Sequence, residues 1–281
     1  MRFNSLEDRM LYFRGLTNYK LMPKSYVMVM LDGRSFSTMI KNKFEKPFDD
    51  KFIYMMNETA KYVCSKVEGA KFGYVQSDEI SLVITDFENE NTESFFGYRL
   101  TKMLSIIASL ATAKFNQLMM DYRISQVEGC SASAGDTVQM CRDAVNDMPL
   151  YQFDCKCWNL PTYNDVFAWF LYRQIDCIRN SKQQAAQARI SHKQLESLNT
   201  DEQVNLLKEM TGVDWNDYED GKKFGRFIYR VEEEFEYKGE RTNPNIPATY
   251  TRHYWKAFDG FKLTDEDGRE RFDGIGAIPI R

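Results

Sequence analysis

Two apolar runs separated by an acidic turn constrain the fold of this chain more than any other feature. Residues 71–77 read Lys-Phe-Gly-Tyr-Val-Gln-Ser and residues 80–84 read Ile-Ser-Leu-Val-Ile, with Asp78 and Glu79 between them. Runs of this length with β-branched and aromatic residues predict strands, and the short polar link predicts a hairpin. The two carboxylates are therefore expected at the tip of a hairpin.

A third apolar run leads into a second acidic position. Residues 25–31 read Ser-Tyr-Val-Met-Val-Met-Leu and are followed by Asp32 and Gly33. If this strand lies beside the hairpin, up to three carboxylates meet at one edge of a sheet. Such oxygen-rich clusters bind Mg²⁺, and Mg²⁺ in this position is typical of phosphoryl chemistry on a nucleotide. The alternative is that acidic residues occupy these positions only because turns tolerate them.

The predicted elements follow an order that defines the fold class. They are a strand at 25–31, a helix at about 49–68, strands at 71–77 and 80–85, a helix at about 93–121 and a strand at about 152–158. This β-α-β-β-α-β order is the split βαβ motif. It predicts an α/β protein with a palm-like antiparallel sheet and helices on one face. Polymerase palms and nucleotidyl cyclases share this topology with many unrelated proteins, so the fold alone does not define a function.

The remaining residues extend this unit. We expect a palm-like catalytic domain over 1–158, and a helical and β extension over 159–281 that completes the same catalytic unit. Within these two parts we expect an irregular insertion at 127–150, helices at about 163–188 and 191–209, and strands at 225–231 and 248–255.

Composition argues against several classes of protein. The six cysteines form no Cys-x-x-Cys pair and only two histidines are present, so a zinc site is not expected. Residues 1–9 have no apolar signal segment, and no apolar run has the length of a membrane span. These features predict a cytoplasmic protein with reduced thiols and no membrane partner. Because the net charge is −4, an RNA-binding surface would have to be a local basic patch or one assembled across subunits.

Six short segments occur in a characteristic order along the chain. They are Leu31-Asp-Gly-Arg-Ser-Phe36, Lys46-Pro-Phe-Asp49, Gln76-Ser-Asp-Glu79, Arg99-Leu-Thr-Lys102, Phe153-Asp154 and Arg173-Gln-Ile-Asp-Cys177. This ordered set resembles the tRNA-His guanylyltransferase-like family, the reverse-direction nucleotidyltransferases that extend RNA at its 5′ end. The resemblance spans roughly residues 25–229. No single segment is specific, but the ordered set is.

The resemblance implies a catalytic centre with two Mg²⁺ ions. The metal-binding residues would be Asp32, Gly33, Asp78 and Glu79, and Asp32, Asp78 and Lys46 would be the catalytic residues. Gly33 has no Cβ, which would let its carbonyl oxygen approach a metal. Two metals would together bind the attacking and leaving oxygens of an in-line displacement.

The resemblance also implies contacts to ATP and to GTP or another nucleoside triphosphate. Lys46 would contact phosphate, Asp49 the nucleotide, and Ser77 would have a secondary role. Arg99 and Lys102, one helical turn apart, would bind a triphosphate. The alternatives are a helix N-cap for Asp49, a turn hydroxyl for Ser77 and an ordinary exposed basic face for the last two.

The sequence does not decide the roles of four further polar residues. Arg34 either pairs with a carboxylate or contacts phosphate. Arg173 and Asp176 either form an i, i+3 salt bridge or act in the site. His192 precedes a predicted helix, and its role stays open.

The resemblance implies a two-step reaction and a homotetramer. ATP would first adenylylate an RNA 5′-monophosphate, and the 3′-hydroxyl of an incoming nucleoside triphosphate would then displace AMP. Residues 178–182 read Ile-Arg-Asn-Ser-Lys, where the tRNA-His-specific branch has His-Ile-Asn-Asn-Leu. This departure indicates the bacterial, archaeal and phage-type branch, and template-dependent repair of 5′-truncated tRNA. The alternatives are a nucleotidyl cyclase and a catalytically inactive RNA-binding module.

Overall fold

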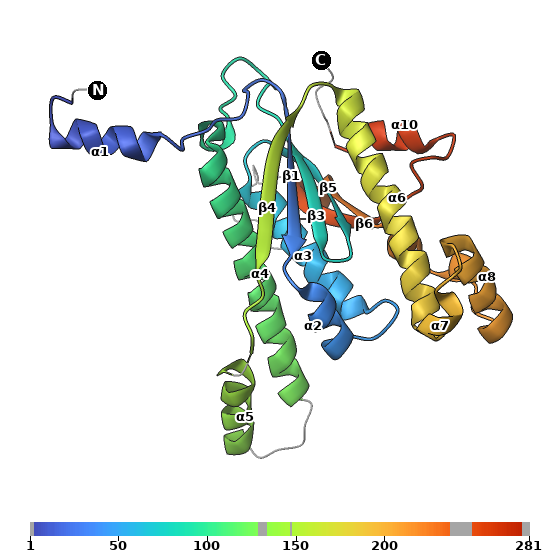
Figure 1. Ribbon diagram of the computed structural model, residues 1–281. Helices are drawn as coiled ribbons and strands as arrows, with labels where there is room; N and C mark the ends of the chain where they lie inside the picture. The colour runs from blue at the N-terminus through green and yellow to red at the C-terminus, as the bar shows by residue number, and fades with distance from the viewer. Residues whose placement is uncertain (1–2, 129–133, 147, 237–248, 277–281) are drawn as a thin grey trace.

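A computed structural model describes residues 3–128, 134–146, 148–236 and 249–276, and its centre is one antiparallel sheet of six strands (Figure 1). The strands lie in the order β4-β1-β3-β2-β5-β6. Their bounds are β1 Tyr26–Gly33, β2 Ala70–Gln76, β3 Glu79–Ile84, β4 Phe153–Leu160, β5 Arg226–Glu236 and β6 Thr249–Asp259. The first four form the predicted palm-like sheet, and the extension adds β5 and β6 to its edge.

Helices cover both faces of this sheet. Their bounds are α1 Leu6–Gly15, α2 Phe36–Lys43, α3 Asp50–Lys66, α4 Leu100–Glu128, α5 Ala134–Asn146, α6 Tyr163–Gln187, α7 His192–Leu195, α8 Thr200–Thr211, α9 Asp220–Phe224 and α10 Gly268–Asp273. The palm helices α3 and α4 share one face, as predicted, in a core that includes Val29, Ile80 and Met103. The opposite face packs against α6 and α10 through Phe170 and Phe272. Full burial of one such side chain stabilises the fold by about 1.5–3 kcal/mol.

The predicted helix at 93–121 begins later than expected. Phe96, Gly97 and Tyr98 have φ values of 52°, 59° and 51°, a left-handed conformation that an α-helix cannot contain. The chain therefore forms a short 3₁₀ turn at Phe95–Tyr98, and α4 starts at Leu100. Arg99, which was predicted to lie on this helix, precedes it.

Two other predicted segments differ from the structure. The insertion at 127–150 is not irregular throughout, because it contains the end of α4 and all of α5; residues 129–133 and 147 lie outside the described residues. The single helix expected at 191–209 divides into α7 and α8. Asn199 causes this division, because its side chain accepts the N–H groups of Asp201 and Glu202 and so caps a new helix.

The remaining predicted elements agree with the structure within a few residues. Residue 248 of the predicted last strand lies outside the described residues. Among the helices in the described ranges, none has the combination of length and hydropathy that a bilayer span requires.

Candidate nucleotide and metal site

Three carboxylates lie side by side across the end of the sheet. In the strand register Asp32 of β1 is opposite Glu79 of β3 on one side and Asp154 of β4 on the other. Side chains directly opposite each other on one face of a sheet have Cβ atoms about 4.5–5.5 Å apart. Asp78 occupies the adjoining hairpin turn, where the N–H of Gly33 donates to its carbonyl oxygen at 3.1 Å. The predicted convergence of acidic residues is therefore present.

The alternation of each strand determines which face these carboxylates occupy. Val29 and Leu31 of β1 pack in the core under α3 and α4, whereas Met28 packs against α6. Asp32 follows the same alternation as Met28, so it lies on the α6 face. Phe153-Asp154 is one of the six ordered segments, but the sequence assigned Asp154 no role in the site. Its position in a predicted strand was visible, but the pairing of that strand with β1 was not.

Burial and mutual repulsion raise the pKa values of these aspartates. Burial raises the pKa of Asp78 to about 6, and the negative charge of Asp32 contributes to the rise. Burial also raises the pKa of Asp32, with Asp154 adding to it and Lys156 and Arg173 opposing it. Repelling carboxylates held together in this way favour a bound cation.

The carboxylate of Glu79 forms an ion pair with Arg173 of α6. Arg173 donates from Nε to Oε1 at 2.8 Å and from Nη2 to Oε2 at 2.5 Å. Burial raises the pKa of Glu79 although Arg173 lowers it, and the pair holds the pKa of Arg173 above its usual value. Both carboxylate oxygens accept from Arg173, and the predicted metal contact of Glu79 stays a prediction. The ion pair fixes α6 against the hairpin that carries Asp78.

The structure gives the contacts of the neighbouring polar residues whose roles the sequence did not decide. Arg173 also forms the i, i+3 salt bridge with Asp176, at 3.1 Å, and Asp176 pairs in turn with Arg179. Arg34 is exposed and donates to Gln152 Oε1 at 3.4 Å, so it lies toward the β4 side of the site. His192 is exposed at the first residue of α7.

The donor set fits Mg²⁺ completed by a substrate. Within the described ranges no three His, Cys, Asp or Glu side chains are arranged to hold a metal on their own. Mg²⁺ is usually bound by one or two carboxylates together with water and substrate phosphates, and Asp32 and Asp78 supply that number. Gly33 is also required for packing, because a Cβ there would lie 2.5 Å from the ring of Phe36.

A hollow of about 290 Å³ opens beside Asp78. Its lining includes Lys46 and Ser77, both predicted as site residues, together with Lys41 and Gln187, which were not. The hollow thus combines one predicted metal ligand with two ammonium groups. This is the charge distribution that a nucleotide phosphate chain bound to a divalent cation requires.

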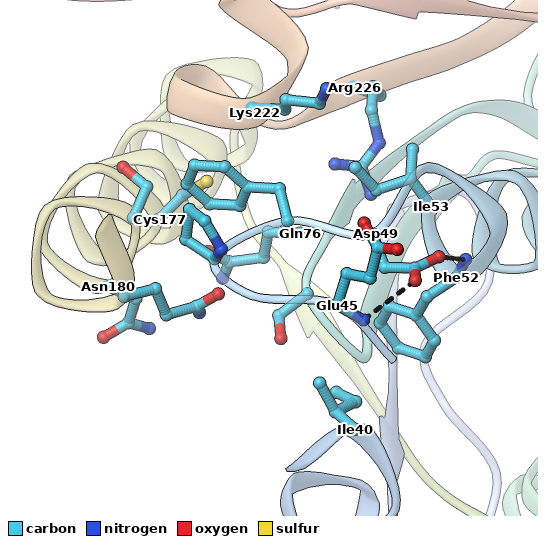
Figure 2. Close-up of a pocket in the computed structure, with 15 residues that line it drawn as sticks. Ile40, Glu45, Asp49, Phe52, Ile53, Gln76, Cys177, Asn180, Lys222 and Arg226 are labelled. Carbon is cyan, nitrogen blue, oxygen red and sulfur yellow. Dashed lines mark hydrogen bonds between the residues drawn. The ribbon is translucent and has the colours of Figure 1, made fainter. Parts of the chain in front are cut away.

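A second pocket adjoins this hollow and shares Ile40, Pro47, Ser77 and Gln184 with it. Figure 2 shows its lining residues, which come from α2, the loop before α3, the start of α3, the hairpin, α6, α9 and the start of β5. Asp49 lies in its wall and is also the N-cap of α3. Its carboxylate accepts the N–H groups of Lys51, Phe52 and Glu45 at 2.8, 3.0 and 2.9 Å. The predicted N-cap is therefore confirmed, while a nucleotide contact stays a prediction.

Arg99 and Lys102 lie at the other end of the sheet. Arg99 bridges to Lys20, which precedes β1, whereas Asp32 is at the far end of that strand, about 20 Å from its start (Figure 1). Lys102 Nζ lies 4.9 Å from the ring of Phe96. One chain therefore does not bring these two cations to a nucleotide held at the aspartates. The predicted triphosphate contact would require a second chain.

A palm-like antiparallel sheet with two aspartates beside a cationic hollow is typical of enzymes that transfer nucleotidyl groups. The sequence profile of the tRNAHis guanylyltransferase family matches residues 8–161, more than half of the chain. The chain belongs to this family, which confirms the resemblance seen in the sequence. The further prediction of a bacterial, archaeal and phage-type branch stays a prediction.

Two solved structures support this assignment. A bacterial tRNA(His) guanylyltransferase-like protein in complex with ATP aligns with a TM-score of 0.75 and 30% identity, over 98% of this chain and 100% of that one. A bacterial protein of the same description in complex with GTP aligns with a TM-score of 0.68 and 29% identity, over 96% of each chain. These matches confirm the palm-like fold.

Curated relatives include a viral protein and a plant enzyme. An uncharacterised protein of Acanthamoeba polyphaga mimivirus is 29% identical over 230 residues, which cover 79% of this chain and 75% of the relative. The tRNA(His) guanylyltransferase 1 of Arabidopsis thaliana is 23% identical over 224 residues, which cover 76% of this chain. The aligned part is 35% of the Arabidopsis protein, so the chain spans about a third of that enzyme.

Proposed function

We propose that this protein is a nucleotidyltransferase that adds nucleotides to the 5′ end of tRNA in the 3′-to-5′ direction. The observation that carries the proposal is that Asp78 lines a hollow together with Lys41 and Lys46, while the charge of Asp32 acts on Asp78. The ATP and GTP complexes of the bacterial relatives support nucleotides as substrates.

The proposed reaction has two in-line displacements. First, an oxygen of the RNA 5′-monophosphate attacks the α-phosphorus of ATP, the bond to the bridging oxygen of the β-phosphate breaks, and pyrophosphate leaves. Second, the 3′-hydroxyl of the incoming nucleoside triphosphate attacks the activated 5′ phosphorus. The bond to AMP breaks, AMP leaves and the hydroxyl proton passes to solvent. Both displacements involve the same charges, so one site would serve both.

Some residues of this chain would bind the metal ions, and others would bind the phosphates. Two Mg²⁺ ions would neutralise charge on the phosphates and on the attacking oxygen when bound. Asp32 and Asp78 would hold them, with the carbonyl oxygen of Gly33 as a further ligand. Lys46 and Lys41 would bind the phosphate chain. Glu79 would act indirectly, because its ion pair holds the hairpin in place.

The sequence at 178–182 supports template-dependent repair of truncated tRNA. Ile178 packs in an apolar cluster, the Arg179 guanidinium pairs with Asp176, and Lys182 pairs with Asp201 at 2.5 Å. These side chains are engaged within the chain, so we propose that pairing with the opposite RNA strand selects the incoming nucleotide. A mispaired nucleotide would hold its 3′-hydroxyl about 1 Å out of line, which can cost on the order of a hundredfold in rate.

A homotetramer in the cytoplasm is part of the proposal. None of the residues of α1 is buried, and Leu6 and Phe13 are 73% and 49% exposed, so a second chain would cover apolar surface there. It would also supply Arg99 and Lys102 to a neighbouring site. The five cysteines in the described ranges have free thiols, which suits a reducing compartment. Light scattering would measure the mass of the assembly.

The test is incubation with a set of tRNAs that lack the first nucleotide and differ only in the opposing base. With ATP, all four nucleoside triphosphates and Mg²⁺, we expect 5′ extension by the complement of that base. Addition of G regardless of the template would refute template dependence. A cyclic nucleotide formed without RNA would indicate a nucleotidyl cyclase, and RNA binding without turnover would indicate an inactive binding module.

A further inference from the structure

Lys156 is an exposed lysine of β4 that lies beside the aspartates of the site. It is opposite Met30 of β1 and shares the α6 face of the sheet with Asp154, two residues earlier. Asp32 is its diagonal neighbour, and such neighbours lie about 7–8 Å apart, within reach of a long side chain. The charge of Lys156 counteracts the rise in the pKa of Asp32. None of the salt bridges within the described ranges includes Lys156, so its ammonium group is available to a ligand.

The edge of a sheet provides a purely structural reason for an exposed lysine. β4 is one edge of this sheet, and charged side chains on edge strands prevent pairing with other chains. Lys256 on β6, the other edge, is exposed in the same way, but the carboxylate of Glu233 lies 3.3 Å from its ammonium nitrogen. An edge position alone does not explain why Lys156 lies next to Asp32 and Asp154.

A row of aromatic rings continues from Lys156 on the same face of the sheet. Trp158 follows two residues later on β4, and its ring centroid lies 4.6 Å from that of Trp169 on α6. The Trp169 ring lies 5.8 Å from that of Tyr172, a residue that is 58% exposed. The indole N–H of Trp169 donates to Ser81 Oγ at 3.3 Å, which holds the middle ring in place. A cation followed by aromatic rings is typical of surfaces that bind the phosphate and the base of a single nucleic acid strand.

The in-line geometry of the proposed reaction determines which substrate lies on this side of the aspartates. If the β- and γ-phosphates of ATP lie at Lys41 and Lys46, pyrophosphate leaves toward the hollow, and the attacking group approaches the α-phosphorus from the opposite direction. That attacking group is an oxygen of the RNA 5′-monophosphate. The turn of the β2–β3 hairpin lines the hollow, and β4 lies on the other side of β1 from this hairpin. The RNA end therefore belongs beside Lys156.

We propose that Lys156 binds the 5′-monophosphate of the RNA and that Tyr172 contacts its first nucleotide. The inference rests on the proposed function, because it assumes an RNA 5′ end as the second substrate. The positive charge offsets the repulsion between the RNA phosphate and the phosphates of ATP, two anions that must meet for the first displacement. In the second displacement the same RNA phosphorus is attacked, so one cation holds this phosphate through both steps.

The chemistry of the RNA 5′ end tests the inference without turnover. Dissociation constants are measured with Mg²⁺, and without nucleoside triphosphates, for one truncated tRNA that carries either a 5′-monophosphate or a 5′-hydroxyl. We expect the parent protein to bind the monophosphate about tenfold more tightly, because a charge-assisted contact is made only to that form. K156A should reduce this preference to less than threefold. Equal affinities in the parent, or an undiminished preference in K156A, would overturn the proposal.

Initial rates then separate Lys156 from the nucleotide site. K156A should raise the KM for the truncated tRNA about tenfold and change the KM for the nucleoside triphosphate by less than threefold, the reverse of the effect expected for K46A. K156R keeps the charge and should restore most of the RNA affinity. K256A, on the other edge strand, is the matched control and should behave like the parent. An equal rise of both KM values in K156A would refute a specific contact to the RNA.

A further variant tests the contact of Tyr172. Y172A should weaken binding of the 5′-monophosphate and 5′-hydroxyl RNAs alike, by about fivefold or more, because a stacked base does not depend on the phosphate. Unchanged affinities would refute this contact. Melting curves check that each variant is folded. Absence of extension by the parent would refute the proposed function, whereas the comparison of the two 5′ ends needs no turnover and still decides whether Lys156 binds the RNA phosphate.

Discussion

Removal of Arg173 from its ion pair with Glu79 provides a direct test of the proposed site architecture. The side chains are only 11% and 8% exposed, so solvent screens the pair weakly. R173M leaves a buried carboxylate without its cation, and loss of one partner of a buried pair typically costs about 3–5 kcal/mol. In a chain of 281 residues this should lower the melting temperature by on the order of 10 °C.

The pH dependence identifies the cause of this loss. Without Arg173 the pKa of Glu79 should rise further, because burial already raises it. A carboxyl group with a raised folded pKa destabilises the fold when it ionises, so the penalty should be full above that pKa and shrink as the pH falls below it. Urea unfolding at several pH values from 4.5 to 8 would measure the difference in free energy of unfolding.

The control is a double-mutant cycle with E79Q. The neutral amide of E79Q needs no cation, so R173M in that background should cost less than half of what it costs alone. A loss below about 1 kcal/mol for R173M alone, or a loss that does not change with pH, would refute the argument that this ion pair fixes α6 to the hairpin.

Three further predictions concern the aspartates and the phosphate hollow. D32N or D78N should lower turnover by at least about a hundredfold while the fold stays intact. Extension of a truncated tRNA measures the turnover, and a melting curve checks the fold. Near-normal activity would exclude a catalytic role for the substituted aspartate. In the absence of metal, the protein should lose stability as the pH rises from 4 to 7, because the pKa of Asp78 is raised to about 6 and its ionised form is disfavoured in the fold. Melting curves of D78N should depend less on pH than those of the parent. The same pH dependence in both proteins would contradict this prediction. K46A should raise the KM for the nucleoside triphosphate about tenfold, whereas K43A, whose lysine lies outside the hollow, should leave it unchanged. Initial-rate assays measure both values, and equal effects of the two substitutions would show that Lys46 does not bind the phosphates.

The sequence by itself determined the strands and the position of the acidic turn. The apolar runs at 25–31 and 80–84 are local properties of the chain, as is the polar link at Asp78. They can be recognised without knowing which segments pair. The N-cap at Asp49 was predicted for the same reason, because a capping side chain bonds to backbone only a few residues away. The ordered motifs added the family, which the profile match confirmed.

Only the tertiary structure decided which residues meet. Asp154 lies opposite Asp32 because β4 pairs with β1, and Arg173 occupies Glu79 because α6 crosses the face of the sheet above it. The left-handed residues before α4 and the position of Lys20 beside Arg99 place that cation at the far end of the sheet. These contacts depend on strand order and helix packing, which arise from side chains far apart in the chain. Local patterns carry no information about them, because the free energy that selects one pairing over another is gained only when the two segments bury each other.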